Sequence, residues 1–175
     1  MTRALPFAGA ALAGALLLAF CLALTGGSAA GPAPAKAGTW KGPDGAYSIV
    51  TPRGWKAVAS GSAATVLQRS DKRGVIVIRE RAAVHGSLEA LAGRLERRLR
   101  RQIDDFRPAG ARLAAVGGGQ GLIYTFVRPA ANQVQSVVVA PAGDRSYTLD
   151  LVADGDAPDV ARELAGMVRS FSPKR

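Results

Sequence analysis

The sequence has few of the residue types from which active sites and metal centres are built. Its 175 residues include one cysteine, Cys21, and one histidine, His85. Because no cysteine follows residue 30, disulfides, thiol catalysis and cysteine metal sites are excluded from the rest of the chain. A single imidazole cannot build a zinc site, which needs several protein ligands. We therefore predict no metal site, no cofactor and no catalytic residues.

Acidic residues are also scarce. The chain has 13 Asp and Glu against 23 Lys and Arg, a net charge of +10. Since Arg3 is the one charged residue before position 31, the remainder carries +9. A basic chain outside the cytoplasm meets anionic lipid headgroups, acidic wall polymers or acidic proteins before it meets nucleic acid. The basic residues are not interleaved with aromatic ones, so we predict no nucleic-acid partner.

The first 30 residues have the layout of an export signal. Arg3 precedes an apolar stretch at residues 7–24, and Ser28-Ala29-Ala30 offers small residues for a cleavage site. The apolar stretch is close to the roughly 18–20 residues that a membrane-spanning helix needs. Two interpretations therefore stay open, a cleaved signal peptide and a retained N-terminal anchor. Either one predicts an exported protein, periplasmic or extracellular.

Cys21 raises a third possibility, lipidation, because the stretch LAFC resembles a lipoprotein attachment motif. Phe20 is bulky where that motif has a small residue, and residues 22–24 continue the apolar run beyond the cysteine. We therefore expect Cys21 to contribute only apolar surface to the signal and not to carry a lipid.

The rest of the chain reads as one domain on a tether. Residues 31–38, GPAPAKAG, have the composition of a semi-rigid Pro/Ala/Gly linker. Residues 39–175 suit one domain of ordinary size and show no internal repeat. We expect this domain to be monomeric.

Alternation of apolar and polar residues predicts most of the secondary structure as β-strands. The predicted strands are residues 46–51, 55–59, 64–70, 74–83, 111–116, 121–128, 134–140 and 145–153. Short turns separate most of them, so consecutive strands should pair antiparallel. Pro52 should end the first strand, and Trp55 should lie in the core. The segment VGGGQG, residues 116–121, precedes a strand and lacks the Lys-Ser/Thr of a phosphate-binding loop, which predicts a turn.

Two helices interrupt the strands. The first runs from residue 88 to about residue 106, capped by Ser87, with an apolar stripe at Leu88, Leu91, Leu95, Leu99 and Ile103. The second spans residues 157–170, with Asp156 as its expected cap and Pro158 in its first turn. Strands and helices in this order predict an α+β domain, an antiparallel sheet flanked by helices.

Four short segments resemble the PsbP-like fold, also called the Mog/PsbP fold, which includes bacterial exported proteins similar to DcrB. They are YSIVTPRGW at 47–55, GGGQGLIYTFV at 117–127, RSYTLDLVA at 145–153 and MVRSFSP at 167–173. The resemblance implies an α/β/α sandwich used for binding or assembly, with Phe171 pinning the final helix. It implies no shared activity, because a fold hosts many functions.

The strongest functional signal is an arginine-rich face on the first helix. Arg94, Arg97, Arg98 and Arg101 lie away from the leucine stripe and form the candidate interaction face. A solvated helix surface is the ordinary explanation of such a face. A docking surface for anionic lipid headgroups, a wall polymer or an acidic envelope protein is the functional one.

Other candidate groups have structural explanations. His85 lies in the turn before the first helix, where a solvated or capping role is expected. Asp104 and Asp105 are adjacent at a helix end and point apart, so they are poor acid/base partners. The stretch DGDAPD, residues 154–159, lacks the glutamate that ends a calcium loop. We predict a non-enzymatic accessory or binding module of the envelope, with a lipid- or polymer-binding protein as the alternative and an unrecognised hydrolase as a third hypothesis.

Overall fold

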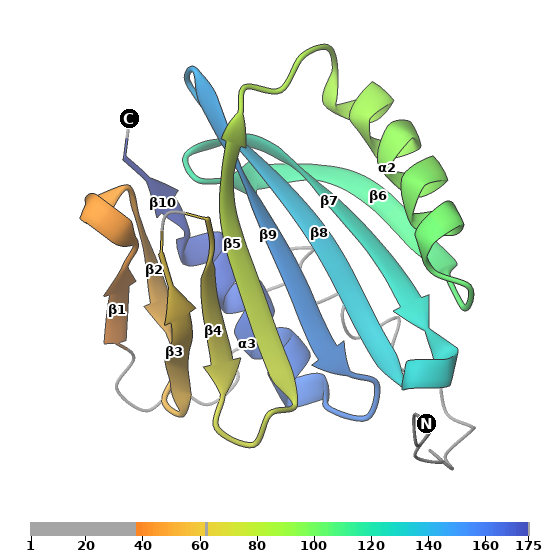
Figure 1. Cartoon of the computed structure of the whole chain (residues 1–175), viewed down its shortest axis with the longest axis horizontal. Helices are drawn as coiled ribbons and strands as arrows, with labels where there is room; N and C mark the ends of the chain where they lie inside the picture. Colours follow the sequence, from red (N-terminus) through yellow and green to blue (C-terminus); the bar gives the residue numbers. More distant parts are fainter. Residues whose placement is uncertain (1–37, 62, 175) are drawn as a thin grey trace, which may run out of the picture.

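The main layer of the molecule is a seven-stranded antiparallel sheet in the spatial order β3-β4-β5-β9-β8-β7-β6. The computed structural model describes residues 38–61 and 63–174 (Figure 1). The strands of this sheet are β3 (Trp55–Ser60), β4 (Thr65–Arg69), β5 (Gly74–Ala82), β6 (Arg107–Val116), β7 (Gly119–Arg128), β8 (Gln133–Ala142) and β9 (Arg145–Asp154). Each of them overlaps a predicted strand, and the predicted α+β class is confirmed.

A second, three-stranded sheet lies beside the first and has the order β1-β2-β10. Its members are β1 (Gly38–Lys41), β2 (Tyr47–Thr51) and β10 (Ser172–Pro173), with a 3₁₀ turn, η1 (Pro43–Gly45), between the first two. Only β2 was predicted, and it ends before Pro52 as expected. β1 begins at the last residue of the predicted linker, and β10 joins the chain's C-terminal end to β2.

Helices cover opposite faces of the large sheet. α2 (Leu88–Gln102) contacts β6 and β7, while α3 (Pro158–Ser170) lies on the other face, against β9, β5 and the small sheet (Figure 1). This is the predicted α/β/α sandwich. Within the described residues, neither helix is long and apolar enough to cross a membrane.

The first helix is shorter than predicted. It ends at Gln102, and Ile103 already has an extended backbone. The expectation that it continues to residue 106 is wrong, because Asp104 and Asp105 form a turn that sends Phe106 into the core. β6 then starts at Arg107 and carries Pro108 next to a bulge on an edge strand, where a proline is tolerated.

Three aromatic rings hold the two sheets together. Tyr47 of β2, Tyr147 of β9 and Phe171 after α3 have ring centroids 5.4–5.6 Å apart in each pair. Such ring pairs contribute about 0.5–1.5 kcal/mol each beyond the apolar area that they bury. Phe171 is 2% exposed, so the predicted pinning of the last helix by this residue is confirmed.

The glycine-rich segment is the predicted turn between two strands. Gly117 and Gly118 have φ values of 65° and 76°, the left-handed region that a two-residue hairpin turn needs at both positions. Gly121 has a different role, because a Cβ there would lie 2.7 Å from the carbonyl oxygen of Val139. The segment therefore serves backbone geometry and close strand packing.

The predictions on the N-terminal part fall outside the described residues. These are the signal or anchor at residues 1–30, the fate of Cys21, and the linker up to residue 37.

Candidate functional site

α2 carries the predicted arginine face, and the packing of α2 on the sheet determines the direction in which that face points. Ser87 caps the helix as predicted, since its Oγ accepts a hydrogen bond from the Ala90 amide at 3.2 Å. Leu95 and Leu99 are buried under the helix. They form a cluster of their own with Phe106, Tyr124 and Phe126. This cluster sets the rotation of α2 about its axis.

The four predicted arginines share one flank of α2. Successive helical residues are about 100° apart, so Arg94, Arg97, Arg98 and Arg101 fall within an arc of about 100°. All four are exposed. Among the described residues none of them pairs with an Asp or Glu, and Arg94 donates only to the His85 carbonyl oxygen, at 3.3 Å. We call these four residues the unpaired flank.

The other flank of α2 is neutralised within the fold. Arg100 donates to the Glu96 carboxylate at 2.8 and 3.0 Å and lies 5.4 Å from the centroid of the Phe106 ring. The hydrogen bond from Arg100 holds the pKa of Glu96 below its usual value. Burial, and then the Glu96 carboxylate, raise the pKa of Tyr124. On this side Arg100 and Glu96 neutralise each other's charge, and Arg100 lies against the Phe106 ring.

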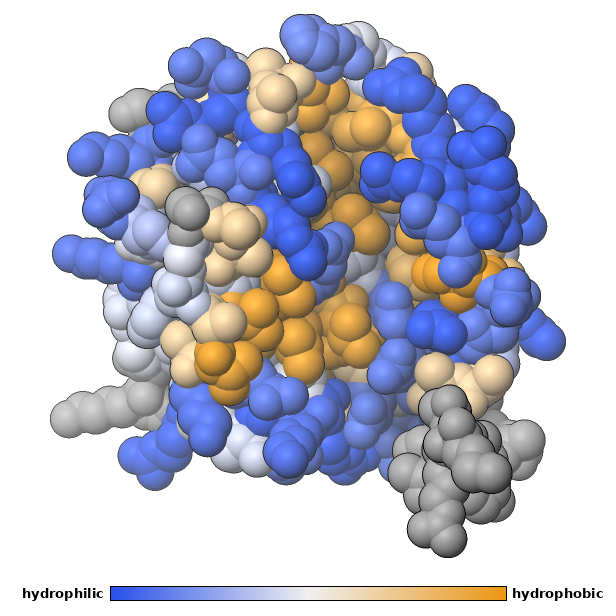
Figure 2. Space-filling model, viewed as in Figure 1, coloured by the Kyte–Doolittle hydropathy of each residue, from blue (hydrophilic) through white to orange (hydrophobic). Residues whose placement is uncertain are grey.

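These contacts show which way the unpaired flank faces. Phe106 leads directly into β6, the edge strand of the large sheet. The flank with Glu96 and Arg100 therefore lies on the side of that edge. The unpaired flank points the other way, toward the strands of the sheet that α2 leaves uncovered. Figure 2 shows this side of the molecule, with blue side chains along both margins of an orange strip.

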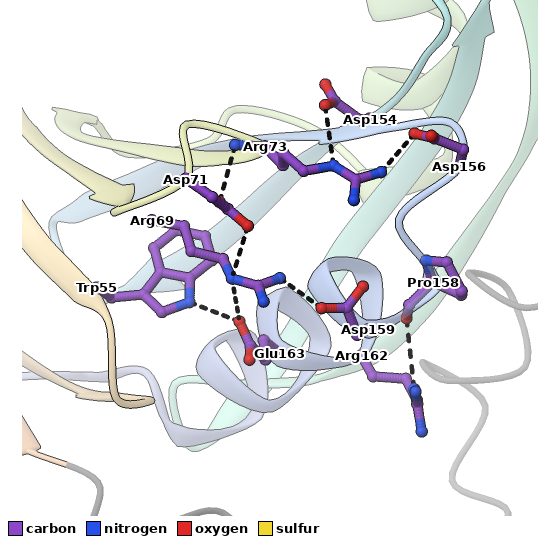
Figure 3. Close-up of polar contacts among 10 residues, drawn as sticks. All are labelled: Trp55, Arg69, Asp71, Arg73, Asp154, Asp156, Pro158, Asp159, Arg162 and Glu163. Atoms are coloured by element: carbon purple, nitrogen blue, oxygen red, sulfur yellow. Dashed lines mark hydrogen bonds and ion pairs between the residues drawn. The ribbon is translucent and has the colours of Figure 1, made fainter.

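A second group of charged residues surrounds Trp55 at the opposite end of the sheet order (Figure 3). The indole Nε1 donates to Glu163 at 2.7 Å, and Arg69 Nη1 lies 2.6 Å from Asp159. Burial opposes ionisation of Asp159, but the Arg69 guanidinium more than compensates and lowers its pKa. Trp55 is 8% exposed and packs over Gly74, where a Cβ would approach it to 2.9 Å. The prediction that Trp55 is a core residue is confirmed.

Asp156 does not cap α3, so that prediction is wrong. The N-cap is Ala157, which makes no side-chain capping bond. Asp156 instead accepts from Arg73 Nη2 at 2.6 Å, and Asp154 accepts from Arg73 Nε at 3.4 Å (Figure 3). The arginine of the β4–β5 turn competes for the carboxylate, and Pro158 at the first helical position removes one amide that would need a cap.

A pocket that the sequence did not reveal opens between the small sheet and the ends of β5 and β9. Its volume is about 1290 Å³, and its lining includes Glu80, Arg81, Arg145 and Lys174. Arg145 pairs with Glu80 at 3.2 Å, and Glu80 also accepts from the buried Tyr147 hydroxyl. Charges of both signs are mixed here, which gives no preference for a ligand of either sign.

The remaining candidates do not come together as a reactive site. His85 is exposed, and its carbonyl oxygen, not its ring, makes the contact to Arg94. Asp105 binds Arg128 and the amide of Ala130, away from its neighbour Asp104. Across residues 38–61 and 63–174 no three His, Cys, Asp or Glu side chains are grouped so that they could hold a metal ion.

Comparisons with known proteins show which solved structures have a similar fold. No protein-family model and no curated protein sequence matches the chain. Among solved structures it is similar to the cyanobacterial PsbP protein (CyanoP) of Synechocystis sp. PCC 6803, with a TM-score of 0.60 and 17% identity over 85% of this chain and 98% of that one. It is also similar to LpqN of Mycobacterium tuberculosis, described as involved in cell envelope biogenesis, with a TM-score of 0.51 and 13% identity over 80% and 91% of the two chains. A Pseudomonas aeruginosa protein of unknown function gives a TM-score of 0.51 and 12% identity over 81% and 99%. The chain has the PsbP-like fold.

Proposed function

We propose that this protein is an exported, non-enzymatic accessory module of the cell envelope, and that it docks to an acidic envelope protein through the unpaired flank of α2. The observation that carries the proposal is the contrast on one helix. Arg100 is matched by Glu96, whereas Arg94, Arg97, Arg98 and Arg101 are exposed without an acidic partner in the described part of the chain. Cations aligned in this way lower the free energy of an approaching anionic surface.

Two further facts support the envelope as the place of action. The first 30 residues have the layout of an export signal. LpqN, which has a similar fold, is described as involved in cell envelope biogenesis. We take the protein to act as a monomer.

The same flank supports a second candidate function, binding of an anionic lipid surface or wall polymer. The net charge of +10 and the alignment of the four arginines would serve either partner. Specificity separates the two candidates, because a lipid or polymer surface recognises charge density and a protein also recognises shape.

The test compares the full chain with a variant in which Arg94, Arg97, Arg98 and Arg101 are changed to Gln. The matched control changes four exposed basic residues that lie outside α2, Lys41, Arg53, Arg162 and Lys174, to Gln. Each protein is used to capture envelope proteins and is also titrated with vesicles of an anionic phospholipid at two salt concentrations. Capture of one protein that is lost in the α2 variant and kept in the control supports the proposal.

Salt-sensitive vesicle binding that is lost in the same variant would support the lipid-binding alternative. Equal behaviour of the α2 variant and the control in both assays would mean that the arginines are only a solvated surface. Hydrolase activity lost in His85→Ala would contradict the non-enzymatic assignment.

A further inference from the structure

One face of the large sheet is only partly covered. α2 contacts β6 and β7 on this face, and α3 lies on the opposite one. Among the described residues no helix covers the same side of β8, β9, β5 and β4 (Figure 1). Figure 2, drawn from this side, shows an orange strip over these strands.

Valines form the floor of this uncovered strip. On β4, β5 and β9 the buried residues Leu67, Ile76 and Leu151 point toward α3, so their neighbours along each strand point to the uncovered side. The half-buried floor residues are Val66, Val75, Val77, Val137 and Val152. Cross-strand register places Val66 beside Val77 and Val75 beside Val152. The ion pair of Arg79 with Asp150 interrupts this floor, because the register places Asp150 between Val137 and Val77. An apolar surface with polar margins is the usual mark of an interaction site.

The strip has room for a helix beside α2. Neighbouring strands are about 4.7–4.9 Å apart, and packed helices lie about 8–10 Å apart. A helix beside α2 would therefore be displaced by two strands, from β6–β7 to β8–β9. The floor valines lie on these strands and on the next two, β5 and β4. α2 itself shows that this sheet face accepts an amphipathic helix, since its leucines pack on Tyr124 and Phe126 of β7.

The margin of the strip along α2 is basic. On one side the unpaired flank presents Arg94, Arg98 and Arg101, spaced four and three residues apart along α2. Across the strip, at the end of β5 beyond Val77, Arg79 is neutralised by Asp150 and Arg81 is exposed, so the margin along α2 is the more basic one. The chain's own residues 1–37 contain no Asp or Glu, and the α2 of a second copy carries the same arginines. Neither could neutralise the margin along α2.

We propose that the uncovered strip binds an amphipathic helix of a partner protein, which packs an apolar stripe on the valine floor and directs acidic residues at three- and four-residue spacing toward α2. The inference rests on the proposed function, and it adds that the partner protein is recognised through an amphipathic helix. The valines contribute the apolar contact, and the arginines fix the position of the helix on the strip.

The experiment titrates the full chain with two fluorescent synthetic peptides and follows anisotropy. Both are amphipathic helices with leucines at three- and four-residue spacing, and one has Glu where the other has Lys. The floor variant is Val77→Thr with Val152→Thr, which keeps side-chain shape and strand propensity. The wall variant is Arg94→Gln, Arg98→Gln and Arg101→Gln, and its charge-matched control is Lys41→Gln, Arg53→Gln and Arg162→Gln. Circular dichroism and the unfolding midpoint confirm that each variant is folded.

We expect the acidic peptide to bind, the basic peptide not to bind, and both the floor and the wall variants to lose about tenfold or more in affinity while the control keeps its affinity. Loss in the wall variant alone would overturn the helix-docking inference and leave the proposed function standing. No loss in either variant would overturn both. Binding of anionic vesicles without binding of the acidic peptide would overturn the inference in favour of a lipid surface.

A second measurement needs no substitution in the protein. A photo-crosslinking group in the apolar stripe of the acidic peptide should attach to β5, β8 or β9. Attachment that is confined to α3 or the small sheet would overturn the inference.

Discussion

The arginines around Trp55 and the arginines of α2 are in opposite electrostatic circumstances. Arg69 and Arg73 meet carboxylates from α3 and from the segment before it, and Trp55 shares Glu163 with Arg69 (Figure 3). The unpaired flank of α2 has no such partners among the described residues. Arginines of the first group connect segments distant in the sequence, and those of the second remain available to another molecule.

The difference in ion pairing comes from the number and position of the acidic residues on each helix. α3 contributes Asp159 and Glu163 on the side that faces β3 and β4. α2 has only Glu89 and Glu96, and Glu96 is already bound to Arg100. The arginines of the two regions should therefore respond differently to substitution, in stability at the Trp55 end and in binding at α2.

The largest expected effect is that of Trp55→Ala. It removes a buried ring that packs over Gly74 and donates to Glu163, so the free energy of unfolding should fall by about 3–5 kcal/mol. Chemical denaturation checks this value. Trp40→Ala, which removes a half-buried ring from the small sheet, is the matched control and should cost less. Equal losses in the two variants would mean that Trp55 and its contacts contribute no more to stability than a half-buried tryptophan does.

Arg69→Met should have an intermediate effect, a loss of about 1–2 kcal/mol at neutral pH, because Asp159 and Glu163 lose their ion pairs in a partly exposed place. The loss should also depend on pH. Since the pKa of Asp159 is lower in the folded protein than its usual value of 3.8, the pair stabilises the fold above that value. Its contribution disappears as the pH falls through the folded-state pKa.

The wild type and Arg69→Met should therefore converge in stability in acid, below about pH 4. Unfolding curves measured at several pH values test this, with Arg162→Met as a control on α3, the helix that carries Asp159 and Glu163. A difference between wild type and Arg69→Met that stays constant into acid would contradict the role assigned to the pair.

The smallest effect on stability is expected where we place the function. Changing Arg94, Arg97, Arg98 and Arg101 to Gln removes exposed side chains without acidic partners and keeps good helix formers. The free energy of unfolding should change by less than about 0.5 kcal/mol, as for other surface substitutions. Thermal or chemical unfolding measures this. A larger loss would show that these arginines are structural, as Arg69 is.

The sequence allowed most of the elements to be predicted, and the reasons are local. Strands such as β5 and β9 alternate apolar and polar residues, and α2 and α3 repeat apolar residues every three or four positions. β1 and β10 escaped prediction because four and two residues are too few to show a period. β6 was predicted too short because Pro108 signals a break, whereas a bulge on an edge strand accommodates it.

The candidate site could be predicted only in part. Helical spacing alone placed Arg94, Arg97, Arg98 and Arg101 on one side of a helix. The same reasoning assigned Asp156 to a cap, because the competing Arg73 lies 83 residues away in the sequence. The valine floor could not be recognised, since Val66, Val77 and Val152 look like ordinary strand residues until the position of α2 shows which strands stay uncovered.

The sequence by itself determined the type of each long element, the apolar stripe of each helix and the excess of positive charge, because these depend on neighbours a few residues apart. Only the tertiary structure decided which arginines are neutralised and which sheet face is left open. Ion pairing and burial depend on distances between segments far apart in the chain, and those distances exist only once the strands have paired.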